Sequence, residues 1–349
     1  MGMILDDVRI PIVLSPMAGG PSTPELAVAV SDAGGLGFLA AGYLDAAEMS
    51  RRVARVRAAT AAPFGVNLFV PGTPTPPEQY AGYLDRLGRE FPLGEARFET
   101  DDWAAKLDAL VAEPVPVASF AFGSPSAAEI GRLHAAGTEV WVTVTAVGEA
   151  RLAIEAGADV LVAQGAEAGG HRAGFTDDPA ADDRDPLSTL ALLQLLTAAV
   201  DRPVVAAGGI ATGAGIAAVL AAGAAAAQLG TAFLRCPEAG TVPAHREALV
   251  RDIPTMLTRA FTGRRARGLR NDFIVGHPSA PSAYPEIHYA TGPLRQSARA
   301  AGDAGNINMW SGQTHTLITD APAGELVARL ARETKDALEA ALSRRFQSC

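Results

Sequence analysis

Short apolar runs alternate with longer amphipathic stretches along the first two thirds of the chain. Because these runs are continuously apolar, they predict strands that are buried on both faces, as in a parallel sheet. Eight such strands are expected, at Ile12–Pro16, Leu36–Ala41, Phe64–Val70, Val115–Phe122, Glu139–Thr145, Asp159–Gln164, Pro203–Ala207 and Ala226–Phe233.

The stretches between these runs have the spacing of helices that cover a sheet. Pairs such as Ala136-Gly137 and Ala156-Gly157 end a helical stretch directly before the next strand, where glycine suits a left-handed C-cap. The third connection, residues 71–114, is longer and predicts a proline-rich loop and two helical pieces. The other helices are expected at Thr23–Asp32, Ala46–Ala58, Ser126–Ala135, Val147–Glu155, Ser188–Val200 and Thr212–Ala221.

This order of elements predicts an α/β protein, a (β/α)8 TIM barrel over residues 1–234. A doubly wound open sheet is the alternative, which is weakened because no GxGxxG pattern follows the first strand. The alternation stops after residue 234, and residues 235–320 predict a helical cap over one barrel end. The amphipathic segment Glu325–Arg345 predicts that residues 321–349 contain a C-terminal helix that packs back on the barrel.

Composition and charge narrow the class of protein. Hydrophobic residues make up 48% of the chain and charged residues 19%, which excludes a disordered chain. The formal net charge of -9 argues against nucleic-acid or anionic-membrane binding through a general positive field. Residues 203–234 carry no charge, but their alanines and repeated glycines favour a buried strand–helix–strand unit over a membrane span.

The cysteines and histidines give no sign of a structural metal or a disulfide framework. Cys236 and Cys349 are the only cysteines, and no signal peptide is visible, so we expect reduced thiols and a cytoplasmic location. The six histidines form no HxH or HxxxH cluster, and the cysteines lack metal-ligand spacing. We therefore expect no metal site.

The strongest candidate for chemistry follows the sixth predicted strand. In this fold, functional residues lie at the C-terminal ends of the strands. The segment Gln164–His171 (QGAEAGGH) places an amide, a carboxylate, a glycine pair and an imidazole at such an end. Imidazole titrates near neutral pH, which makes His171 the candidate general base.

Other strand ends predict a site for a flat, phosphorylated ligand. Small residues after the first strand would let a flat ligand approach the backbone, and Asn67 needs a hydrogen-bond partner if it is buried. Either feature could also serve an ordinary turn or loop. Gly208-Gly209 and Gln228–Thr231 follow the seventh and eighth strands, where this fold commonly binds phosphate with backbone N–H groups and a helix N-terminus. The phosphate could belong to a phosphosugar, a nucleotide or a flavin mononucleotide.

A basic run lies in the expected cap of this acidic chain. Two interpretations stay open, a solvated face or a cap element that neutralises a ligand phosphate or an anionic substrate. The run comprises Arg259, Arg264, Arg265, Arg267 and Arg270.

The motif set, taken in order, resembles the nitronate monooxygenase family, once called 2-nitropropane dioxygenases. The motifs are PMAGG (Pro16–Gly20), GVN (Gly65–Asn67), QGAEAGGH (Gln164–His171), AAGGI (Ala206–Ile210) and QLGT (Gln228–Thr231). Phe261–Gly268 (FTGRRARG) and Met309–Gln313 (MWSGQ) extend the resemblance into the cap. Each piece alone is weak, but their combination in this order is specific.

The resemblance implies noncovalently bound FMN, with His171 as the catalytic histidine. It implies that the flavin ring lies beside the first strand end, that Asn67 and Gln164 hydrogen-bond it, and that glycine-rich segments hold the phosphate. The implied cofactor residues are Pro16, Met17, Ala18, Asn67, Gln164, Gly169, Gly170, Gly208, Gly209, Gln228, Leu229, Gly230 and Thr231. Trp310, Ser311 and Gln313 match a cap element near the flavin and substrate.

The implied reaction is oxidation of a nitroalkane or its nitronate anion with O2, which gives a carbonyl compound and nitrite. Similar motifs occur in flavin-dependent enoyl-ACP and quinone reductases, so an NAD(P)H-dependent reductase is the alternative. A non-flavin barrel enzyme and a flavin-binding protein without turnover are weaker alternatives. Gly20-Pro21 and the Asp-rich loop after His171 depart from the family and leave the substrate open. The expected partners are a small-molecule substrate and O2; a homodimer is left open.

Overall fold

A computed structural model describes residues 3–179 and 186–343, and its main feature is a closed barrel of eight parallel strands. The order around the barrel is β1-β9-β8-β6-β5-β4-β3-β2. Closure between β1 and β2 comes from the bridge Val13–Leu36, with Leu14 N donating to Leu36 O at 2.9 Å. The strands are β1 Ile12–Leu14, β2 Gly37–Ala40, β3 Phe64–Phe69, β4 Val117–Ala121, β5 Glu139–Val144, β6 Val160–Gln164, β8 Val204–Ala207 and β9 Ala226–Leu229.

The predicted (β/α)8 barrel is therefore confirmed, and all eight strands lie inside or at their expected ranges. The last predicted strand, Ala226–Phe233, is too long. Its final residues instead form a short 3-10 helix, η3 (Thr231–Phe233), in which Phe233 N donates to Gly230 O at 2.9 Å. This turn moves the chain away from the barrel directly after Leu229.

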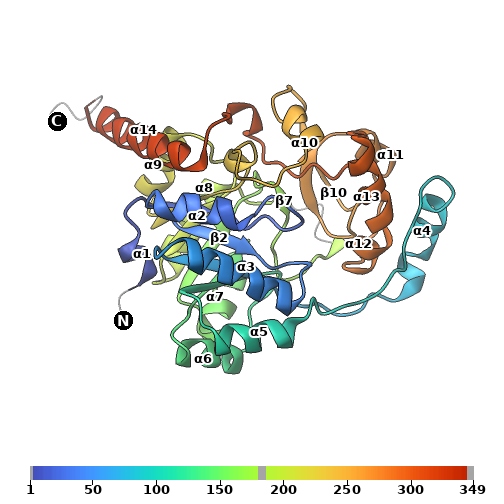
Figure 1. Cartoon of the computed structure of the whole chain (residues 1–349), viewed down its shortest axis with the longest axis horizontal. Helices are drawn as coiled ribbons and strands as arrows, with labels where there is room; N and C mark the ends of the chain where they lie inside the picture. The colour runs from blue at the N-terminus through green and yellow to red at the C-terminus, as the bar shows by residue number, and fades with distance from the viewer. Residues whose placement is uncertain (1–2, 180–185, 344–349) are drawn as a thin grey trace.

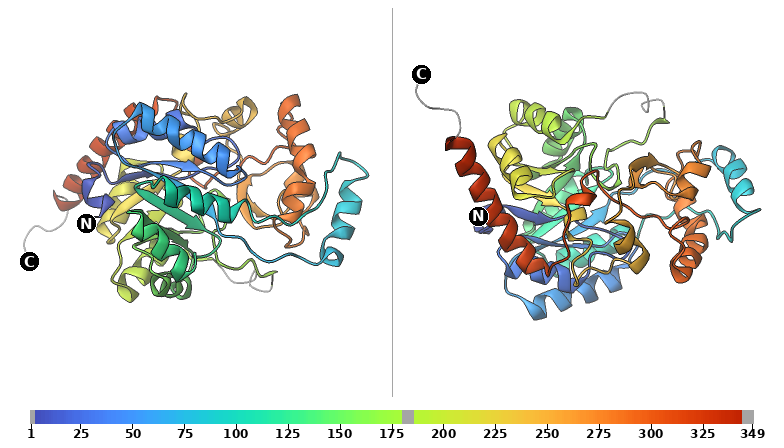
Figure 2. Two further views of the ribbon diagram at one scale, coloured as in Figure 1. Left: turned by 60° about the horizontal axis from the view of Figure 1, so that its bottom comes forward. Right: turned by 90° about the horizontal axis from the view of Figure 1, so that it is seen from above.

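Helices cover the outside of the barrel, as Figures 1 and 2 show. Several begin at a polar N-cap whose side chain accepts a backbone N–H, such as Asp45 before α3 and Ser126 before α6. These helices bury an apolar stripe against the sheet and expose their polar face. Their bounds are α2 Pro24–Asp32, α3 Ala46–Ala59, α5 Trp103–Ala112, α6 Ala127–Ala135, α7 Val147–Ala156, α8 Thr189–Ala199 and α9 Gly213–Ala221, with α1 Ile4–Asp7 near the N-terminus.

Residues 235–320 lie beyond the C-terminal ends of the strands, and they contain a small sheet as well as helices. The sheet is antiparallel, in the order β10-β11-β7, and β7 (Gly170–His171) comes from the loop after β6. The expected helical cap does not include this sheet, because its strands have only two to four residues and leave too little periodicity to recognise. The other elements are α10 Pro243–Ala248, β10 Thr255–Thr258, β11 Ala266–Leu269, α11 Asp272–Gly276, α12 Glu286–Ala290, α13 Gly292–Ala301 and η4 His315–Leu317.

A second chain segment joins this cap. The long third connection holds η1 (Pro77–Gln79) and α4 (Ala81–Leu87), and Figure 1 shows α4 on the side of the cap remote from the barrel. Tyr83 and Leu87 pack with Phe261 and Phe273 in one apolar cluster, and Tyr83 Oη donates to Ala260 O at 2.7 Å. The cap is therefore built from two separate stretches of chain.

The last described helix, α14 (Ala323–Ser343), packs against α9 and α2. Leu326 and Leu330 are buried, whereas the side chain of Leu342 is 75% exposed where the helix extends past the barrel. The expected helix Glu325–Arg345 agrees with these bounds, except that Arg345 lies outside the described residues. No described helix is long and apolar enough to cross a membrane.

Candidate active site

A cavity of about 380 Å³ lies at the C-terminal ends of the barrel strands, enclosed in part by the cap. This is where the fold places its chemistry. Fourteen of the residues singled out from the sequence line the cavity: Pro16, Met17, Ala18, Asn67, Gln164, Gly169, Gly170, His171, Gly208, Gly209, Gln228, Gly230, Thr231 and Trp310.

Three of the residues expected to contact the cofactor or the substrate do not line it. Leu229 is buried in the apolar layer between the barrel and its helices, Ser311 is fully buried behind the wall, and the side chain of Gln313 is exposed. Gly312 and Thr314 reach the cavity from this cap segment instead. The cap segment 310–314 therefore borders the cavity, but through Gly312 and Thr314 in place of the expected Ser311 and Gln313.

His171 lies in the cavity wall, with its imidazole surrounded by aromatic rings. The rings of Phe122, Tyr284 and Trp310 have centroids 5.8, 5.6 and 5.6 Å from that of the imidazole. Its Nε2 is 2.9 Å from Thr262 Oγ1. Burial, together with the nearby charge of Arg264, lowers the pKa of His171 to about 3. The imidazole is therefore neutral at neutral pH, as a general base must be.

Gln164 holds the backbone that carries His171. Its Nε2 donates to His171 O at 2.9 Å, and its Oε1 accepts from Ala173 N at 2.9 Å. Both ends of the Gln164 amide therefore have hydrogen-bond partners within the protein, and these bonds fix the loop after β6. Gln164 also borders the cavity.

Asn67 is buried in β3 and is only partly satisfied. Its Nδ2 donates to Ser119 O at 3.2 Å and to Ser119 Oγ at 3.0 Å. Its Oδ1 accepts no hydrogen bond from a described residue. A ligand N–H group in the cavity would complete this amide.

The glycines of the sixth to eighth strand ends form a cradle that a side chain would fill. An added Cβ at Gly169 would lie 2.5 Å from Gly312 N, and one at Gly209 would lie 2.9 Å from Glu167 Cβ. Gly209 also has a φ of +66°, which favours glycine. Among residues 3–179 and 186–343, no backbone acceptor takes the N–H of Gly209, Gly230 or Thr231. These features suit a phosphate.

The start of the helix after the seventh strand, α9, already has partners within the protein. Gly213 N, at the start of α9, already donates to Glu333 Oε2 of α14 at 3.2 Å, and Gly215 N donates to Thr212 Oγ1 at 3.1 Å. The short helix η3, which begins at Thr231, borders the cavity instead.

A second group of cavity residues escaped the sequence analysis. Tyr43 stacks on His288 with ring centroids 4.0 Å apart and accepts a hydrogen bond from Tyr284 Oη at 3.1 Å. Arg295 donates to His288 O, and burial lowers the pKa of Arg295 to about 10, which leaves it cationic. These residues lie in the β2–α3 loop and the cap, outside any recognisable motif, so no signal in one sequence marks them.

The lining is positive. Arg295 and Arg299 border the cavity, and no Asp or Glu among the described residues does so. Neither arginine pairs with a described carboxylate, since Arg295 bonds His288 O and Arg299 bonds Asn308 Oδ1. The cavity is therefore suited to anionic ligands.

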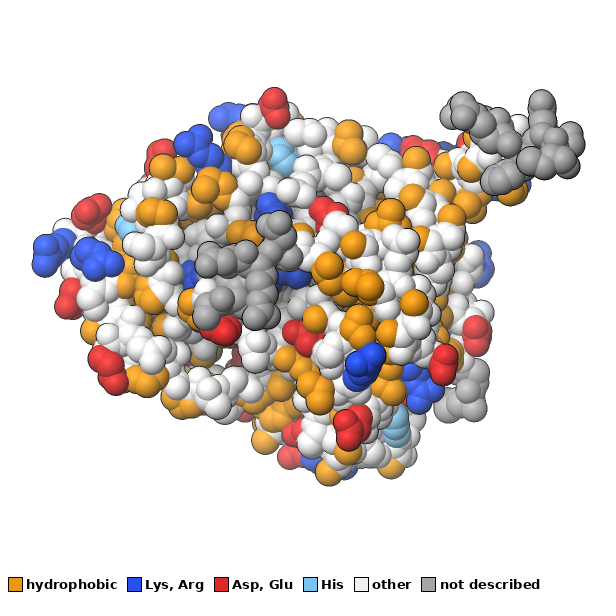
Figure 3. All heavy atoms as spheres, turned by 180° about the vertical axis from the view of Figure 1, so that it is seen from behind, with side chains coloured by type: hydrophobic (Ala, Val, Ile, Leu, Met, Phe, Trp, Pro, Cys, Tyr) orange, Lys and Arg blue, Asp and Glu red, His pale blue; other side chains and the backbone are white. Residues whose placement is uncertain are grey.

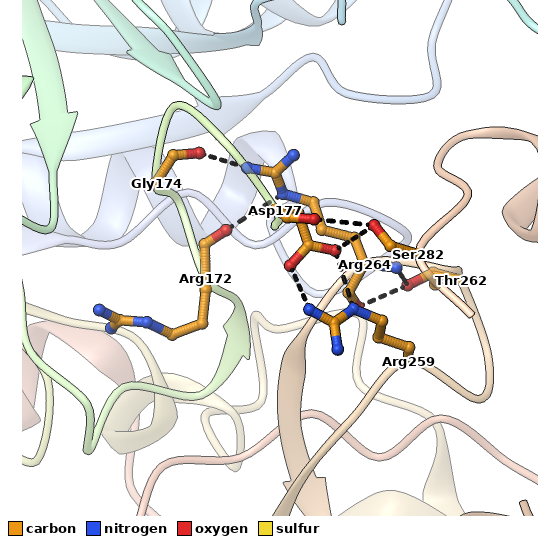
Figure 4. A network of polar contacts seen from close by, with 7 residues as sticks. All are labelled: Arg172, Gly174, Asp177, Arg259, Thr262, Arg264 and Ser282. Atoms are coloured by element: carbon orange, nitrogen blue, oxygen red, sulfur yellow. Dashed lines mark hydrogen bonds and ion pairs between the residues drawn. The ribbon is translucent and has the colours of Figure 1, made fainter. Parts of the chain in front are cut away.

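The basic run fastens the cap to the loop after His171, as Figure 4 shows for part of it. Arg264 donates to Arg172 O and Gly174 O, and Arg259 binds both carboxylate oxygens of Asp177 at 2.9 and 3.0 Å. Arg264 and Arg267 are buried, and Arg267 donates to Ala166 O at 2.9 Å. The solvated-face interpretation is therefore wrong for these three arginines. Arg270 is exposed, and Asp182, Asp183 and Asp185 of the acidic loop lie outside the described residues.

Comparison with protein families gives a match along almost the whole chain. The model of the family described as nitronate monooxygenase matches residues 4–333. A nitronate monooxygenase of Pseudomonas aeruginosa is 42% identical, with 94% of this chain and 97% of that protein aligned. One of Paraburkholderia phytofirmans is 41% identical, over 94% of this chain and 93% of that protein.

Solved structures give the same picture. A nitroalkane oxidase from Streptomyces ansochromogenes superposes with a TM-score of 0.94 at 48% identity, covering 97% of this chain and 99% of that one. FabK from Thermotoga maritima superposes with a TM-score of 0.75 at 30% identity, covering 97% of each chain.

Proposed function

The chain belongs to the nitronate monooxygenase family, a family of oxidoreductases, and we propose that it uses FMN and O2 to convert nitronates and nitroalkanes to carbonyl compounds and nitrite. The substrate is a small molecule that enters the cavity beneath the cap. The observation that carries the proposal is the half-buried imidazole of His171, surrounded by aromatic rings in the wall of a cavity suited to a flavin phosphate.

The residues present fit FMN. The glycine cradle would hold the phosphate together with the N–H groups of Gly209, Gly230 and Thr231, which have no backbone acceptor among the described residues. Asn67 would hydrogen-bond the flavin ring through its Oδ1, which accepts from no described residue, and the backbone of Met17 and Ala18 would lie beside the ring. When bound, FMN supplies the redox chemistry, taking electrons from the substrate and passing them to O2.

His171 would take the α-proton from a neutral nitroalkane. Its imidazole is neutral because burial disfavours the imidazolium, so a lone pair is available without prior deprotonation. Gln164 fixes the backbone of His171, and the aromatic rings around the imidazole limit its rotation. A nitronate lacks this proton and would bypass the step.

Arg295 and Arg299 would favour the anionic form of the substrate. Negative charge that develops as the proton leaves would face two cations and no described carboxylate. Inside a cavity that the protein encloses in part, this interaction is stronger than in bulk solution.

The test begins with the colour of the purified protein. We expect a yellow protein that releases FMN on denaturation, and a colourless protein that takes up no FMN would refute every flavin hypothesis. Such a result would favour a barrel enzyme acting on a phosphorylated metabolite.

Anaerobic mixing then separates oxidase from reductase chemistry. We expect ethylnitronate or propionate 3-nitronate to bleach the flavin absorbance, and O2 to restore it. Bleaching by NADH or NADPH alone would instead favour the reductase alternative, which the similarity to FabK keeps in view. A flavin that neither class of reductant bleaches would indicate a binding protein without turnover.

A further inference from the structure

We propose that Thr262 sets the tautomer of His171, so that Nε2 carries the ring proton and Nδ1 is the atom that takes the substrate proton. Thr262 is in this sense a positioning residue, because the role proposed for it acts through His171. The inference deepens the proposed function and rests on it for its catalytic consequence, whereas the tautomer itself can be measured without any substrate.

The argument starts from the number of protons at Thr262 Oγ1. This oxygen lies 2.9 Å from His171 Nε2, 3.2 Å from Arg264 O and 3.4 Å from Arg264 N. Arg264 O can only accept and Arg264 N can only donate. The single hydroxyl proton can therefore serve either Arg264 O or His171 Nε2, but not both.

Only one assignment turns all three contacts into hydrogen bonds. If the hydroxyl donates to Arg264 O, its lone pairs accept from Arg264 N and from a protonated His171 Nε2. If the hydroxyl donates to Nε2 instead, two oxygens face each other at 3.2 Å without a proton between them. Because Thr262 is 1% exposed, solvent cannot repair that loss. The first assignment is favoured.

The other ring nitrogen of His171 is left for chemistry. Nδ1 makes no hydrogen bond with a described residue, and it is not among the buried polar atoms that lack a partner. Since His171 lines the cavity, Nδ1 is open to it. In the assigned tautomer this atom carries a lone pair, and it is the atom from which a base can act.

Thr262 is held firmly enough to impose this choice. The guanidinium of Arg264 donates to Arg172 O and Gly174 O, directly after His171, as Figure 4 shows. The following residues pair with the His171 strand, since Ala266 lies opposite His171 in the β11–β7 ladder. The neighbouring Gly263 has a φ of +77° and donates to Arg259 O at 2.8 Å, which fixes the turn. The hydroxyl and the imidazole are thus tied to the same pair of strands.

The tautomer is measured by 15N NMR of FMN-loaded protein with labelled histidine, with His171→Gln used to assign the signals. We expect Nε2 to show the shift of a protonated nitrogen and Nδ1 that of an unprotonated one. In Thr262→Val, which keeps the shape but removes the acceptor, the Nδ1–H form should gain population. Thr262→Ser should restore the wild-type pattern. An unprotonated Nε2 in the wild type would overturn the proposal, whatever reaction the protein catalyses.

The catalytic consequence is measured by comparing a neutral nitroalkane with its preformed nitronate. In Thr262→Val, kcat/KM for nitroethane should fall about 10- to 100-fold, which is part of the usual effect of losing a general base. The value of kcat/KM for ethylnitronate should change less than about threefold. Ser282→Ala, which loosens the same loop at Asp177 without touching His171, should affect the two substrates equally. Equal losses for both substrates in Thr262→Val would show a purely structural role and refute the positioning role. A protein that oxidises neither substrate would refute the proposed function and leave the NMR result to decide the tautomer.

Discussion

At the residue scale, burial shifts the pKa values of the candidate active-site residues more than neighbouring charges do. Burial is the main cause that lowers the pKa of His171, and it is also the main cause that raises the pKa of Tyr43 to about 12. Two non-glycine cavity residues, Tyr43 and Phe122, have positive φ values of 68° and 74°. Such conformations persist only when the surrounding structure enforces them, and they cluster at functional sites. The lining is therefore pre-organised around His171.

Replacing His171 by glutamine tests its role as a base. We expect His171→Gln to retain FMN, because the phosphate cradle is untouched, and to lose kcat/KM for nitroethane by about 10²- to 10⁴-fold. Oxidation of ethylnitronate should fall far less, since no proton has to be removed. Steady-state nitrite release measures both rates. An unchanged value for nitroethane would contradict the assignment of His171.

Replacing Gly209 by alanine tests the phosphate cradle. The added Cβ would lie 2.9 Å from Glu167 Cβ at a φ of +66°, so the loop must shift and its N–H groups move with it. We expect the Kd for FMN, measured by fluorescence quenching, to rise about 10- to 100-fold, which corresponds to the loss of one or two hydrogen bonds to a charged group. Gly131→Ala, on the open face of α6, has nothing within 4 Å and is the matched control. Equal Kd values in the two variants would place the phosphate elsewhere.

At the element scale, the C-terminal helix stabilises the barrel by closing the start of α9. The backbone of Gly213 lies directly against α14, and Glu333 of α14 accepts its N–H. The carboxylate also lies at the positive end of the α9 dipole. A glycine is required here because the two helices approach so closely that no side chain fits between them.

Gly213→Ala should therefore destabilise the protein. Its Cβ would overlap Glu333 Cβ and lie 2.5 Å from the Glu333 carbonyl carbon, so α14 must move away. We expect the free energy of unfolding, measured in urea, to fall by about 1–3 kcal/mol. Gly215→Ala in the same helix meets its first neighbour at 3.5 Å and should be neutral or stabilising by up to about 1 kcal/mol. An unchanged free energy of unfolding in Gly213→Ala would mean that α9 and α14 can move apart at little cost.

At the scale of the whole molecule, three histidines whose pKa is lowered in the folded state make the fold sensitive to acid. Burial lowers the pKa of His245 to about 4 and moves that of His288 well below its ordinary value, as it does for His171. Between pH 6.5 and 4, the unfolded chain binds a proton at His245 that the folded chain does not. Stability therefore falls as the pH falls through this range, by about 1.4 kcal/mol per pH unit for each such histidine.

His245→Gln should reduce this sensitivity. We expect the free energy of unfolding in urea to fall more steeply for the wild type than for the variant between pH 6 and 4.5. Above pH 7 the two pH curves should run parallel, which is the internal control. If the two proteins kept parallel curves down to pH 4.5, His245 would have to be protonated in the folded state, which would contradict its buried environment.

The barrel could be predicted from the sequence and much of the cap could not, for a physical reason. Strands such as Val160–Gln164 and helices such as Ala127–Ala135 leave a local pattern of burial and capping. The pairing of β7 with β11 and the meeting of Tyr43 with His288 depend on contacts between distant segments, which no local pattern encodes. The same holds for Arg264, whose burial against the loop after His171 excludes one of the two interpretations left open, the solvated face.

The distribution of charge has a consequence for how fast a substrate can be captured. Acidic and basic side chains are interspersed on the face in Figure 3, and the chain carries a net charge of -9, yet no described carboxylate lines the cavity. An approaching anion is therefore repelled at long range and attracted only near the mouth. Salt weakens the long-range field first, because the Debye length shrinks to about 8 Å near 0.15 M. The capture rate of a nitronate, measured by stopped flow, should therefore rise between about 10 and about 150 mM salt, while that of a neutral nitroalkane stays constant. A nitronate rate that falls from the first addition of salt would mean that Arg295 and Arg299 in the cavity lining govern the encounter.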